Sequence, residues 1–275
     1  MDLFWLKYIP KNQLSNVVGR LVSCRYPKAF SSFTVRQFAQ HFKINMEEAE
    51  HPLEAYPTIS ELFTRRLKAG ARPIQGAEVF PADARIVSCG PVRKGEVLQI
   101  KDRPYALASL LHSTSDSEAC EGGSFITSYL CPTDYHRVHS PVAGQVLSVR
   151  WIPGALWPVN SWGLRNVDGL FAANERIVIQ IRGERGLVFV VMVGATNVGQ
   201  MTLAFDSEIR TNTGRLQIFE KSYSKPHVVK AGDELGIFHM GSTVVTVFEK
   251  TYGVLSPEIL EQSTRVGQAI PWRPQ

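Results

Sequence analysis

The spacing of apolar residues along the chain changes near residue 70. Apolar side chains recur every three or four positions over residues 33–42, which predicts a helix with one apolar face, and residues 60–67 predict a second, shorter helix. Beyond residue 75 the period approaches two, which is typical of strands. Five segments show it most clearly: residues 86–88, 144–151, 176–181, 187–193 and 243–248. We therefore expect an α+β fold, with a helical N-terminal part over residues 1–70 and a mostly antiparallel β domain over residues 71–275.

Residues 186–205 carry no charge and have about the length of a membrane span. The segment is rich in valine, contains Asn197 and Gln200, and is interrupted by glycines. Two buried strands joined by a turn fit this composition better than a membrane helix. The residues just before it, 183–186, predict a short hairpin connection.

A glycine-serine pair, Gly241-Ser242, interrupts the apolar run over residues 235–248. A small and polar break in a strand indicates a bulge, a turn, a close approach of backbones or a strained peptide. A serine that follows glycine can also attack the carbonyl carbon before it. The pattern alone leaves these interpretations open.

Composition indicates a globular protein that can bury a full core. The 275 residues are 44% hydrophobic and 20% charged. The four cysteines form no CxxC pair, which argues against a zinc ribbon or a disulfide scaffold and fits a reducing compartment. We expect no signal peptide, because Asp2 and Lys7 interrupt the early apolar stretch.

The net charge of +5 is concentrated in residues 1–43, which hold seven Lys and Arg against the single acid Asp2. Aromatic and aliphatic residues are interleaved with these charges. Such a mixture suits helices that lie on an anionic membrane surface, and it also suits a helical cap whose charges face water. Nucleic acid is a poorer fit, because the charge does not gather on one evident recognition helix.

Three groups of residues could carry chemistry besides Ser242. His136 and His139 lie three apart between two prolines, which allows a zinc site, a catalytic loop or a structural pair, although no third metal ligand is evident nearby. Asp83 follows Pro-Ala at the start of a predicted strand, as a turn residue or as a carboxylate that orients a histidine. Residues 151–162, with three tryptophans, predict a packed core loop or the apolar lining of a ligand site. The chain has no GxSxG elbow between a strand and a helix.

The ordered set of motifs resembles the phosphatidylserine decarboxylases of the bacterial and mitochondrial type over nearly the whole chain. The matching segments are residues 63–73 (FTRRLKAGARP), 81–83 (PAD), 134–141 (DYHRVHSP), 174–176 (NER), 193–199 (VGATNVG), 232–236 (GDELG) and 240–243 (MGST). Ala84 replaces the usual glycine after the aspartate, and Met240 replaces the usual leucine before Gly-Ser-Thr. Both substitutions roughly preserve the size and polarity of the side chain at that position.

This resemblance implies a proenzyme that cuts itself between Gly241 and Ser242 into residues 1–241 and 242–275. Asp83, His139 and Ser242 would form the charge relay for cutting, in which His139 takes the serine proton. Ser242 would become a covalent pyruvoyl group, which binds the substrate amine as a Schiff base and accepts electrons as CO₂ leaves. His136 is then the expected proton donor.

The resemblance further implies that the substrate is phosphatidylserine, that the product is phosphatidylethanolamine, and that no metal is used. The two fragments are expected to stay together as a heterodimer, and two heterodimers to form a homodimer. We expect peripheral attachment to the anionic, cytoplasmic face of the inner cell membrane through residues 1–70. The alternatives are a biotinyl- or lipoyl-like binding module, which lacks a lysine on a hairpin tip here, and a zinc-dependent hydrolase using His136 and His139.

Overall fold

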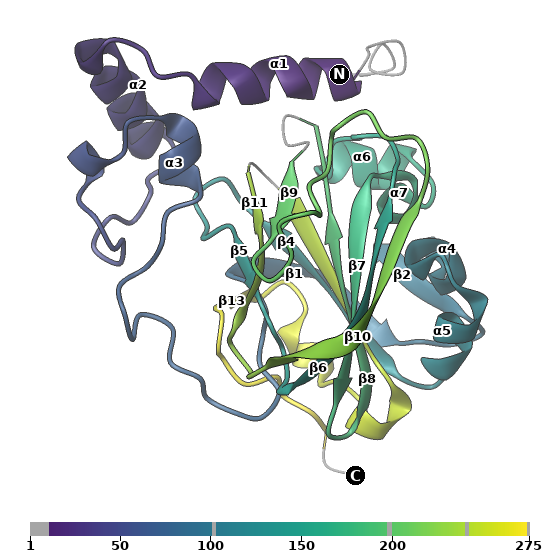
Figure 1. Ribbon diagram of the computed structural model, residues 1–275. Helices are drawn as coiled ribbons and strands as arrows, with labels where there is room; N and C mark the ends of the chain where they lie inside the picture. Colours follow the sequence, from purple (N-terminus) through teal and green to yellow (C-terminus); the bar gives the residue numbers. More distant parts are fainter. Residues whose placement is uncertain (1–10, 101–102, 197–199, 240–241, 274–275) are drawn as a thin grey trace.

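The N-terminal part of the molecule is helical, as expected. The computed structural model describes residues 11–100, 103–196, 200–239 and 242–273. The first elements are α1 (Lys11–Ser23), α2 (Lys28–His41), a 3-10 turn at Leu53–Ala55 and α3 (Ile59–Phe63). α1 lies across one end of the β domain, and α2 and α3 stand at its side (Figure 1). None of the helices in the described ranges is both long and apolar enough to cross a membrane.

α3 begins at a capping box and ends earlier than the sequence pattern predicts. The hydroxyl of Thr58 accepts a hydrogen bond from the backbone N–H of Glu61 at 3.1 Å, which satisfies one free donor of the first turn. The helix stops at Phe63 rather than near residue 67, because the chain becomes extended there and Leu67 bridges to Ala49. A small core joins α2, α3 and the segments between them. It consists of Val35, Ala39, Ile44, Tyr56 and Leu62.

The β domain is built on one eight-stranded antiparallel sheet with the order β10-β6-β7-β8-β12-β4-β1-β13. Its strands are β1 (Ala84–Pro91), β4 (Ser124–Leu130), β6 (Gly144–Ile152), β7 (Arg176–Gly183), β8 (Gly186–Val193), β10 (Phe219–Val229), β12 (Ser242–Phe248) and β13 (Ser263–Thr264). β7 and β8 form the predicted hairpin, in which Gly183 pairs with Gly186. The five predicted strands correspond to β1, β6, β7, β8 and β12, so the α+β expectation is confirmed.

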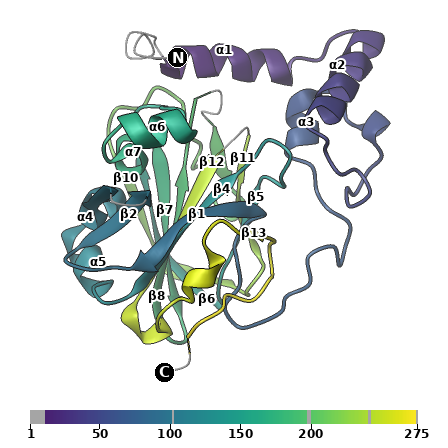
Figure 2. The ribbon, with the colours of Figure 1, turned by 180° about the vertical axis from the view of Figure 1, so that it is seen from behind.

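Both faces of this sheet are buried. One face packs on a three-stranded sheet made of β5 (Arg137–His139), β11 (Glu234–Phe238) and β9 (Met201–Leu203). The other face packs on short helices and a hairpin on the opposite side (Figures 1 and 2). These elements are α4 (Leu107–Leu111), α5 (Thr114–Ala119), α6 (Ser161–Asn166) and α7 (Leu170–Ala173), with β2 (Glu96–Ile100) and β3 (Arg103–Ala106). Two short 3-10 turns, Lys250–Tyr252 and Pro257–Ile259, lead to β13.

The strand β8 explains the uncharged segment at residues 186–205. Its side chains alternate between the two hydrophobic clusters, with Val190 and Met192 on one face and Val191 and Val193 on the other. Because both faces are covered, the strand is apolar throughout rather than alternating. The second strand of the segment is β9, which belongs to the smaller sheet. The prediction of two buried strands is therefore confirmed, although the two strands lie in different sheets.

We expect Val190→Ala to lower the free energy of unfolding by about 2 kcal/mol, because it removes two fully buried methyl groups and leaves a cavity. Val228→Ala is the matched control, since Val228 is 76% exposed, and it should change stability by less than about 0.5 kcal/mol. Urea denaturation of both variants measures the difference. Equal stabilities would contradict the placement of β8 in the core.

Candidate active site

The candidate site lies at one edge of the large sheet, meaning the row of strand ends where β1 and β12 begin and β4 ends. Arg85 of β1 pairs with Tyr129 of β4, and Tyr129 pairs with Thr243 of β12. β1 and β12 run in the same direction, since both are antiparallel to β4. Asp83 and Ser242 each precede this row of residues, so both backbones lie at the same edge, two strand spacings or about 10 Å apart. Gly241 and the side chain of Ser242 lie outside the described residues.

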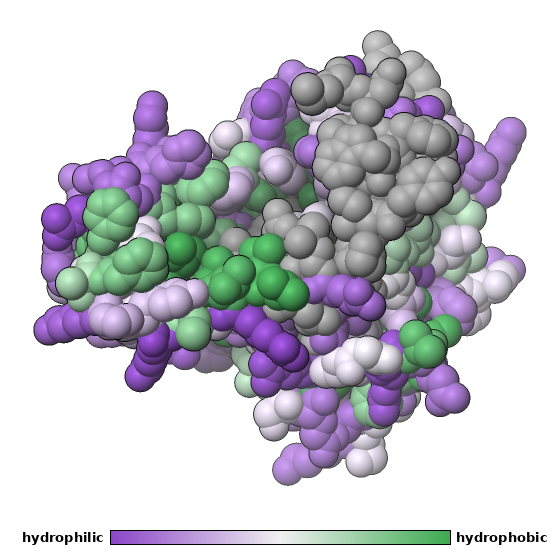
Figure 3. All heavy atoms as spheres, turned by 90° about the horizontal axis from the view of Figure 1, so that it is seen from above, coloured by the Kyte–Doolittle hydropathy of each residue, from purple (hydrophilic) through white to green (hydrophobic). Residues whose placement is uncertain are grey.

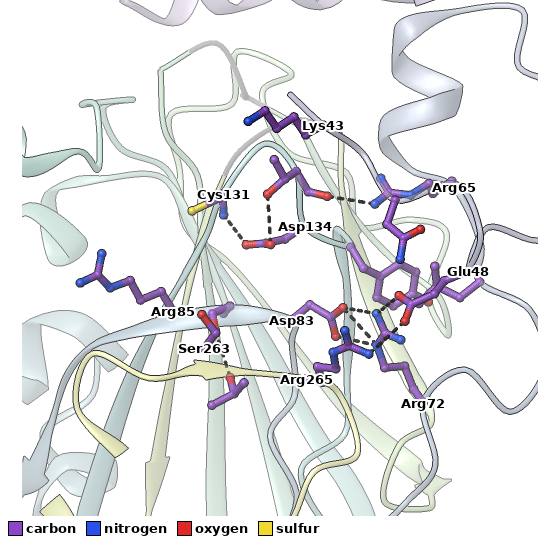
Figure 4. Close-up of a pocket in the computed structure, with 16 residues that line it drawn as sticks. Lys43, Glu48, Arg65, Arg72, Asp83, Arg85, Cys131, Asp134, Ser263 and Arg265 are labelled. Carbon is purple, nitrogen blue, oxygen red and sulfur yellow. Dashed lines mark hydrogen bonds and ion pairs between the residues drawn. The ribbon is translucent and has the colours of Figure 1, made fainter. Parts of the chain in front are cut away.

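Asp83 is buried and held by a guanidinium. Arg72 Nε donates to its two carboxylate oxygens at 2.9 and 3.1 Å, and the backbone N–H of Val266 donates to it at 2.9 Å. Arg72 Nη2 also donates to Glu48 at 2.8 Å (Figure 4). Burial alone disfavours the charged guanidinium, but its hydrogen bonds to Asp83 and Glu48 outweigh burial and raise the pKa of Arg72. The same contact with Arg72 lowers the pKa of Glu48.

His139, at the end of β5, lies beside Asp83 but makes its hydrogen bonds elsewhere. Its backbone N–H donates to the carbonyl of Pro81 at 2.8 Å, which brings the strand next to the Pro-Ala-Asp segment. The ring Nδ1 is 2.7 Å from the carbonyl of Gly232, and Nε2 is 3.1 Å from the hydroxyl of Tyr135. No hydrogen bond joins Asp83 to His139 in the described part of the chain. The carbonyl of Gly232, rather than the carboxylate, therefore orients the imidazole.

The electrostatic influence of Asp83 still reaches His139. Burial lowers the pKa of His139, while the carbonyl of Gly232 and the carboxylates of Glu234 and Asp83 oppose that shift. Because a carbonyl only accepts hydrogen bonds, Nδ1 carries the proton of the neutral ring and Nε2 is the basic nitrogen.

His136 occupies a different environment from His139. Its Nδ1 is 2.9 Å from the carbonyl of Asp134, and its ring lies against the ring of Phe63. The side chain is fully buried, and Nε2 has no hydrogen-bond partner among the described residues. Burial lowers the pKa of His136 to about 3. The ring is therefore neutral at rest.

Sequence reasoning did not single out Arg72 or Tyr135. Both lie inside segments that carry the family resemblance, Arg72 in residues 63–73 and Tyr135 in residues 134–141. Their roles depend on contacts across the fold that no local pattern reports. Arg72 reaches Asp83 from the extended segment that leaves the helical part, and Tyr135 stacks on His139 with ring centroids 5.5 Å apart.

A cavity of about 450 Å³ adjoins this edge, between the helical part and β1, β4 and β13 (Figure 4). Asp83 and Tyr135 line it, together with Asp134, whose pKa is raised by burial. Five cationic side chains line the cavity, against the carboxylates of Asp83, Asp134 and Glu48. They are Lys43, Arg65, Arg72, Arg85 and Arg265. The surplus of positive charge suits an anionic ligand.

The zinc alternative gains no support from the geometry. The described residues contain no cluster of three or more His, Cys, Asp or Glu able to hold a metal ion. The tryptophan-rich segment 151–162 is a packed loop between β6 and α6, with Leu156 and Val159 buried. Trp151 Nε1 donates to buried Glu175 at 2.9 Å. The segment is therefore largely a packed loop, and its residues 159–161 also line a cavity of about 320 Å³.

We expect stability to fall as the pH is lowered from 6.5 towards 3, because the unfolded chain binds a proton at His136 and the folded chain does not. His136 alone should cost roughly 2 kcal/mol between pH 6.5 and pH 4.5. Denaturant titrations at a series of pH values measure this slope, and His136→Gln should make it shallower. Identical slopes in the two proteins would show that the ring is not held neutral.

Comparison with known proteins agrees with the sequence resemblance. Residues 59–271 match the family described as phosphatidylserine decarboxylase. The chain is 38% identical to the phosphatidylserine decarboxylase proenzyme of Myxococcus xanthus (strain DK1622), covering 96% of this chain and 95% of the relative. It is also 38% identical to the proenzymes of Anaeromyxobacter sp. (strain K) and Shewanella sp. (strain ANA-3), over 96% and 95% of this chain and 95% and 93% of those relatives. This enzyme therefore belongs to the phosphatidylserine decarboxylase family, a family of lyases.

Proposed function

We propose that this protein converts phosphatidylserine to phosphatidylethanolamine, using a pyruvoyl group that it makes by cutting itself between Gly241 and Ser242. The observation that carries the proposal is the shared sheet edge. The first residues of β1 and β12, the loop after β4 and the strand β5 lie along this end of the sheet, which supports a site formed by Asp83, His136 and His139 with Ser242. Family membership favours this function over a carrier module or a zinc hydrolase.

The proposed cutting reaction begins with proton transfer from the hydroxyl of Ser242 to Nε2 of His139. The serine oxygen attacks the carbonyl carbon of Gly241, the peptide C–N bond breaks, and an ester takes its place. Gly241 places no side chain in the way of this attack. The carboxylate of Asp83 stabilises the imidazolium through space rather than through a hydrogen bond, and Tyr135 must release Nε2 for the serine.

Elimination across the Cα–Cβ bond of residue 242 then releases residues 1–241 with a free carboxylate. Hydrolysis of the remaining dehydroalanine gives ammonia and the pyruvoyl group. The fragment 242–275 stays in place, because β12 pairs with both β4 and β8, and β13 pairs with β1. These strand pairings support a stable heterodimer of the two fragments. Association of two heterodimers into a homodimer is part of the same proposal.

The pyruvoyl group would supply an electrophilic carbonyl able to take up the substrate amine and to accept electrons during the loss of CO₂. The residues present fit such a group, since a fully buried imidazole nitrogen, Nε2 of His136, has no partner within the described ranges. The backbone carbonyl of His136 accepts from the N–H of Phe238 at 3.0 Å, four positions before Ser242. We assign to His136 the proton that the α-carbon receives.

The helical part is proposed to attach the enzyme peripherally to the cytoplasmic face of the inner cell membrane. Apolar side chains form a band on the face that α1 and α2 present outward (Figure 3). The large apolar side chains of α1 and α2 that are exposed are Val17, Leu21, Phe30 and Phe33. Arg20 and Arg25 lie among them in the sequence, and Arg36 follows Phe33 by three positions. Apolar groups among cations suit an interface with anionic lipid.

Denaturing mass spectrometry of the purified wild-type protein should show two chains, corresponding to residues 1–241 and 242–275. Ser242→Ala should show one chain. His139→Ala and Asp83→Asn should slow cutting by about a hundredfold or more, because the serine loses its base or the base loses its stabilising charge.

His136→Ala should be cut normally and lose decarboxylase activity, whereas His51→Ala, which changes an exposed histidine of the helical part, should alter neither reaction. An active wild-type protein that remains a single chain would overturn the proposal. A block of cutting by His136→Ala would overturn the division of roles between the histidines.

Membrane attachment predicts binding to vesicles that contain anionic lipid, and weaker binding at high salt. Leu21→Asp should reduce partitioning about tenfold or more, because it replaces an exposed apolar anchor by a charge that the lipid repels. Leu260→Asp, at a comparably exposed leucine outside the helical part, is the matched control. Co-sedimentation measures both variants, and an equal loss in both would rule out this face.

A further inference from the structure

We propose that Phe63 is a positioning residue for His136: its ring fixes the orientation of the imidazole and keeps water from it, so that Nε2 is the only free proton-transfer atom of this side chain. The inference rests on the proposed decarboxylase function and goes beyond it. It assigns a role in the chemistry to a residue of the helical part, which the mechanism otherwise uses only for attachment.

The contact between the two rings is close and buried. Phe63 is the last residue of α3, and its ring centroid lies 3.7 Å from that of His136, with 35° between the ring planes. Both side chains are essentially inaccessible to solvent. One face of the imidazole is therefore covered by an aromatic ring, which can neither donate nor accept a conventional hydrogen bond and leaves water no place on that side.

The end of α3 is joined to the histidine-bearing segment by further contacts. Arg65 Nη2 donates to the carbonyl of Thr133 at 3.0 Å. Arg137 donates to the carbonyl of Thr64 from Nε at 3.1 Å and from Nη2 at 2.8 Å. These charge-assisted hydrogen bonds join the two residues that follow Phe63 to residues on either side of His136 in the sequence. Phe63 is therefore held against His136 by the backbone around it as well as by apolar packing.

The hydrogen bond made by Nδ1 of His136 determines which ring nitrogen is free to accept a proton. Nδ1 donates to the carbonyl of Asp134, so the neutral ring carries its lone pair on Nε2. An unprotonated Nε2 accepts a proton before it can donate one. The substrate amine arrives as an ammonium and must lose a proton before its nitrogen can form a bond to carbon. We infer that His136 takes this proton and later returns it to the α-carbon, in place of the carboxylate that leaves as CO₂.

This proton balance needs no further acid inside the site. The ammonium proton moves to Nε2 and then to carbon, and the product amine regains a proton from water after release. The electron pair of the broken C–C bond ends in the new C–H bond of the α-carbon.

Two groups besides Phe63 act on the charge of His136. The carbonyl of Asp134 favours the charged ring, and the positive charge of Arg65 disfavours it. Burial is the largest influence and keeps the ring neutral at rest. Loss of the Phe63 ring would admit water to one face of the imidazole. The pKa of His136 would then rise from about 3 towards its ordinary value.

The test compares Phe63→Leu with Phe38→Leu. Phe38→Leu removes the same atoms from an aromatic ring that packs on Phe63, 6.5 Å away between centroids, but is not in the ring contact with His136. Both variants lose one ring near α3, so general loosening of the helical part affects them alike. Phe63→Tyr keeps the flat ring and tests for rescue. Far-ultraviolet circular dichroism and the extent of cutting show that each variant is folded.

We expect Phe63→Leu to be cut normally, because the side chain of His139 bonds Gly232 and Tyr135 rather than Phe63. Its kcat for decarboxylation should fall about tenfold or more, with KM within about twofold of wild type. Phe38→Leu should keep kcat within about twofold, and Phe63→Tyr should recover most of the lost rate. A kcat for Phe63→Leu equal to that of Phe38→Leu overturns the proposal, and so does a loss that appears only in KM.

A second measurement does not depend on the proposed reaction. Histidine side-chain NMR titrations of the uncut Ser242→Ala chain, with His136 assigned by its absence in Ser242→Ala/His136→Gln, should show the pKa of His136 raised by more than one unit when Phe63→Leu is added. An unmoved pKa overturns the positioning role. If wild-type protein proves not to decarboxylate phosphatidylserine, the proposed function fails, and this titration alone decides whether Phe63 controls His136.

Discussion

The strand β12 is hydrogen-bonded along both of its edges, to β4 and to β8, and the rest of the candidate site depends on this double pairing. It fixes the backbone of Ser242 at an edge of the large sheet, where β1 begins and β4 ends. It also explains how a chain cut just before residue 242 could stay assembled. A strand in the middle of a sheet that is buried on both faces cannot leave without exposing unpaired backbone groups to an apolar surrounding.

Arg72 connects the helical part to this edge. Its guanidinium lies between Glu48, which belongs to the helical part, and Asp83, which precedes β1. Arg72 and Asp83 are each about nine-tenths buried, so the desolvation of both charges is offset only while the pair is intact. Removing one partner of such a buried pair typically costs about 3–5 kcal/mol. The outer contact between Arg265 and Glu48 is more exposed and is worth less than about 1 kcal/mol.

The two histidines show how their surroundings suit one residue type to the two tasks that we propose. Both have Nδ1 tied to a backbone carbonyl, which leaves Nε2 as the proton acceptor. His139 lies near the carboxylates of Asp83 and Glu234, which favour a positive charge. His136 lies against the ring of Phe63, where burial disfavours that charge. His139 is thus the better resting base for a serine hydroxyl, and His136 is protected from solvent protons until an ammonium reaches it.

The sequence alone determined the class of the fold, and it nominated the residues that we propose to carry chemistry. Apolar periodicity identified the helix α2 and five strands of the large sheet, because burial of one or both faces leaves a local pattern. The order of the motifs nominated Asp83, His136, His139 and Ser242, because all four lie in segments that resemble the family. Local patterns could not show that residues 235–248 form β11 and β12 in separate sheets, because each of the two strands is buried within its own sheet and both are therefore apolar.

Contacts between distant segments were decided by the tertiary structure alone. Arg72 on Asp83, the Gly232 carbonyl on His139 and Phe63 on His136 join residues 11, 93 and 73 positions apart. No periodicity relates such positions, because the strand order of the sheet and the path of the helical part set their separation in space. The chain therefore determines which groups are available for chemistry, while the fold decides which of them touch, which are charged and which nitrogen is free.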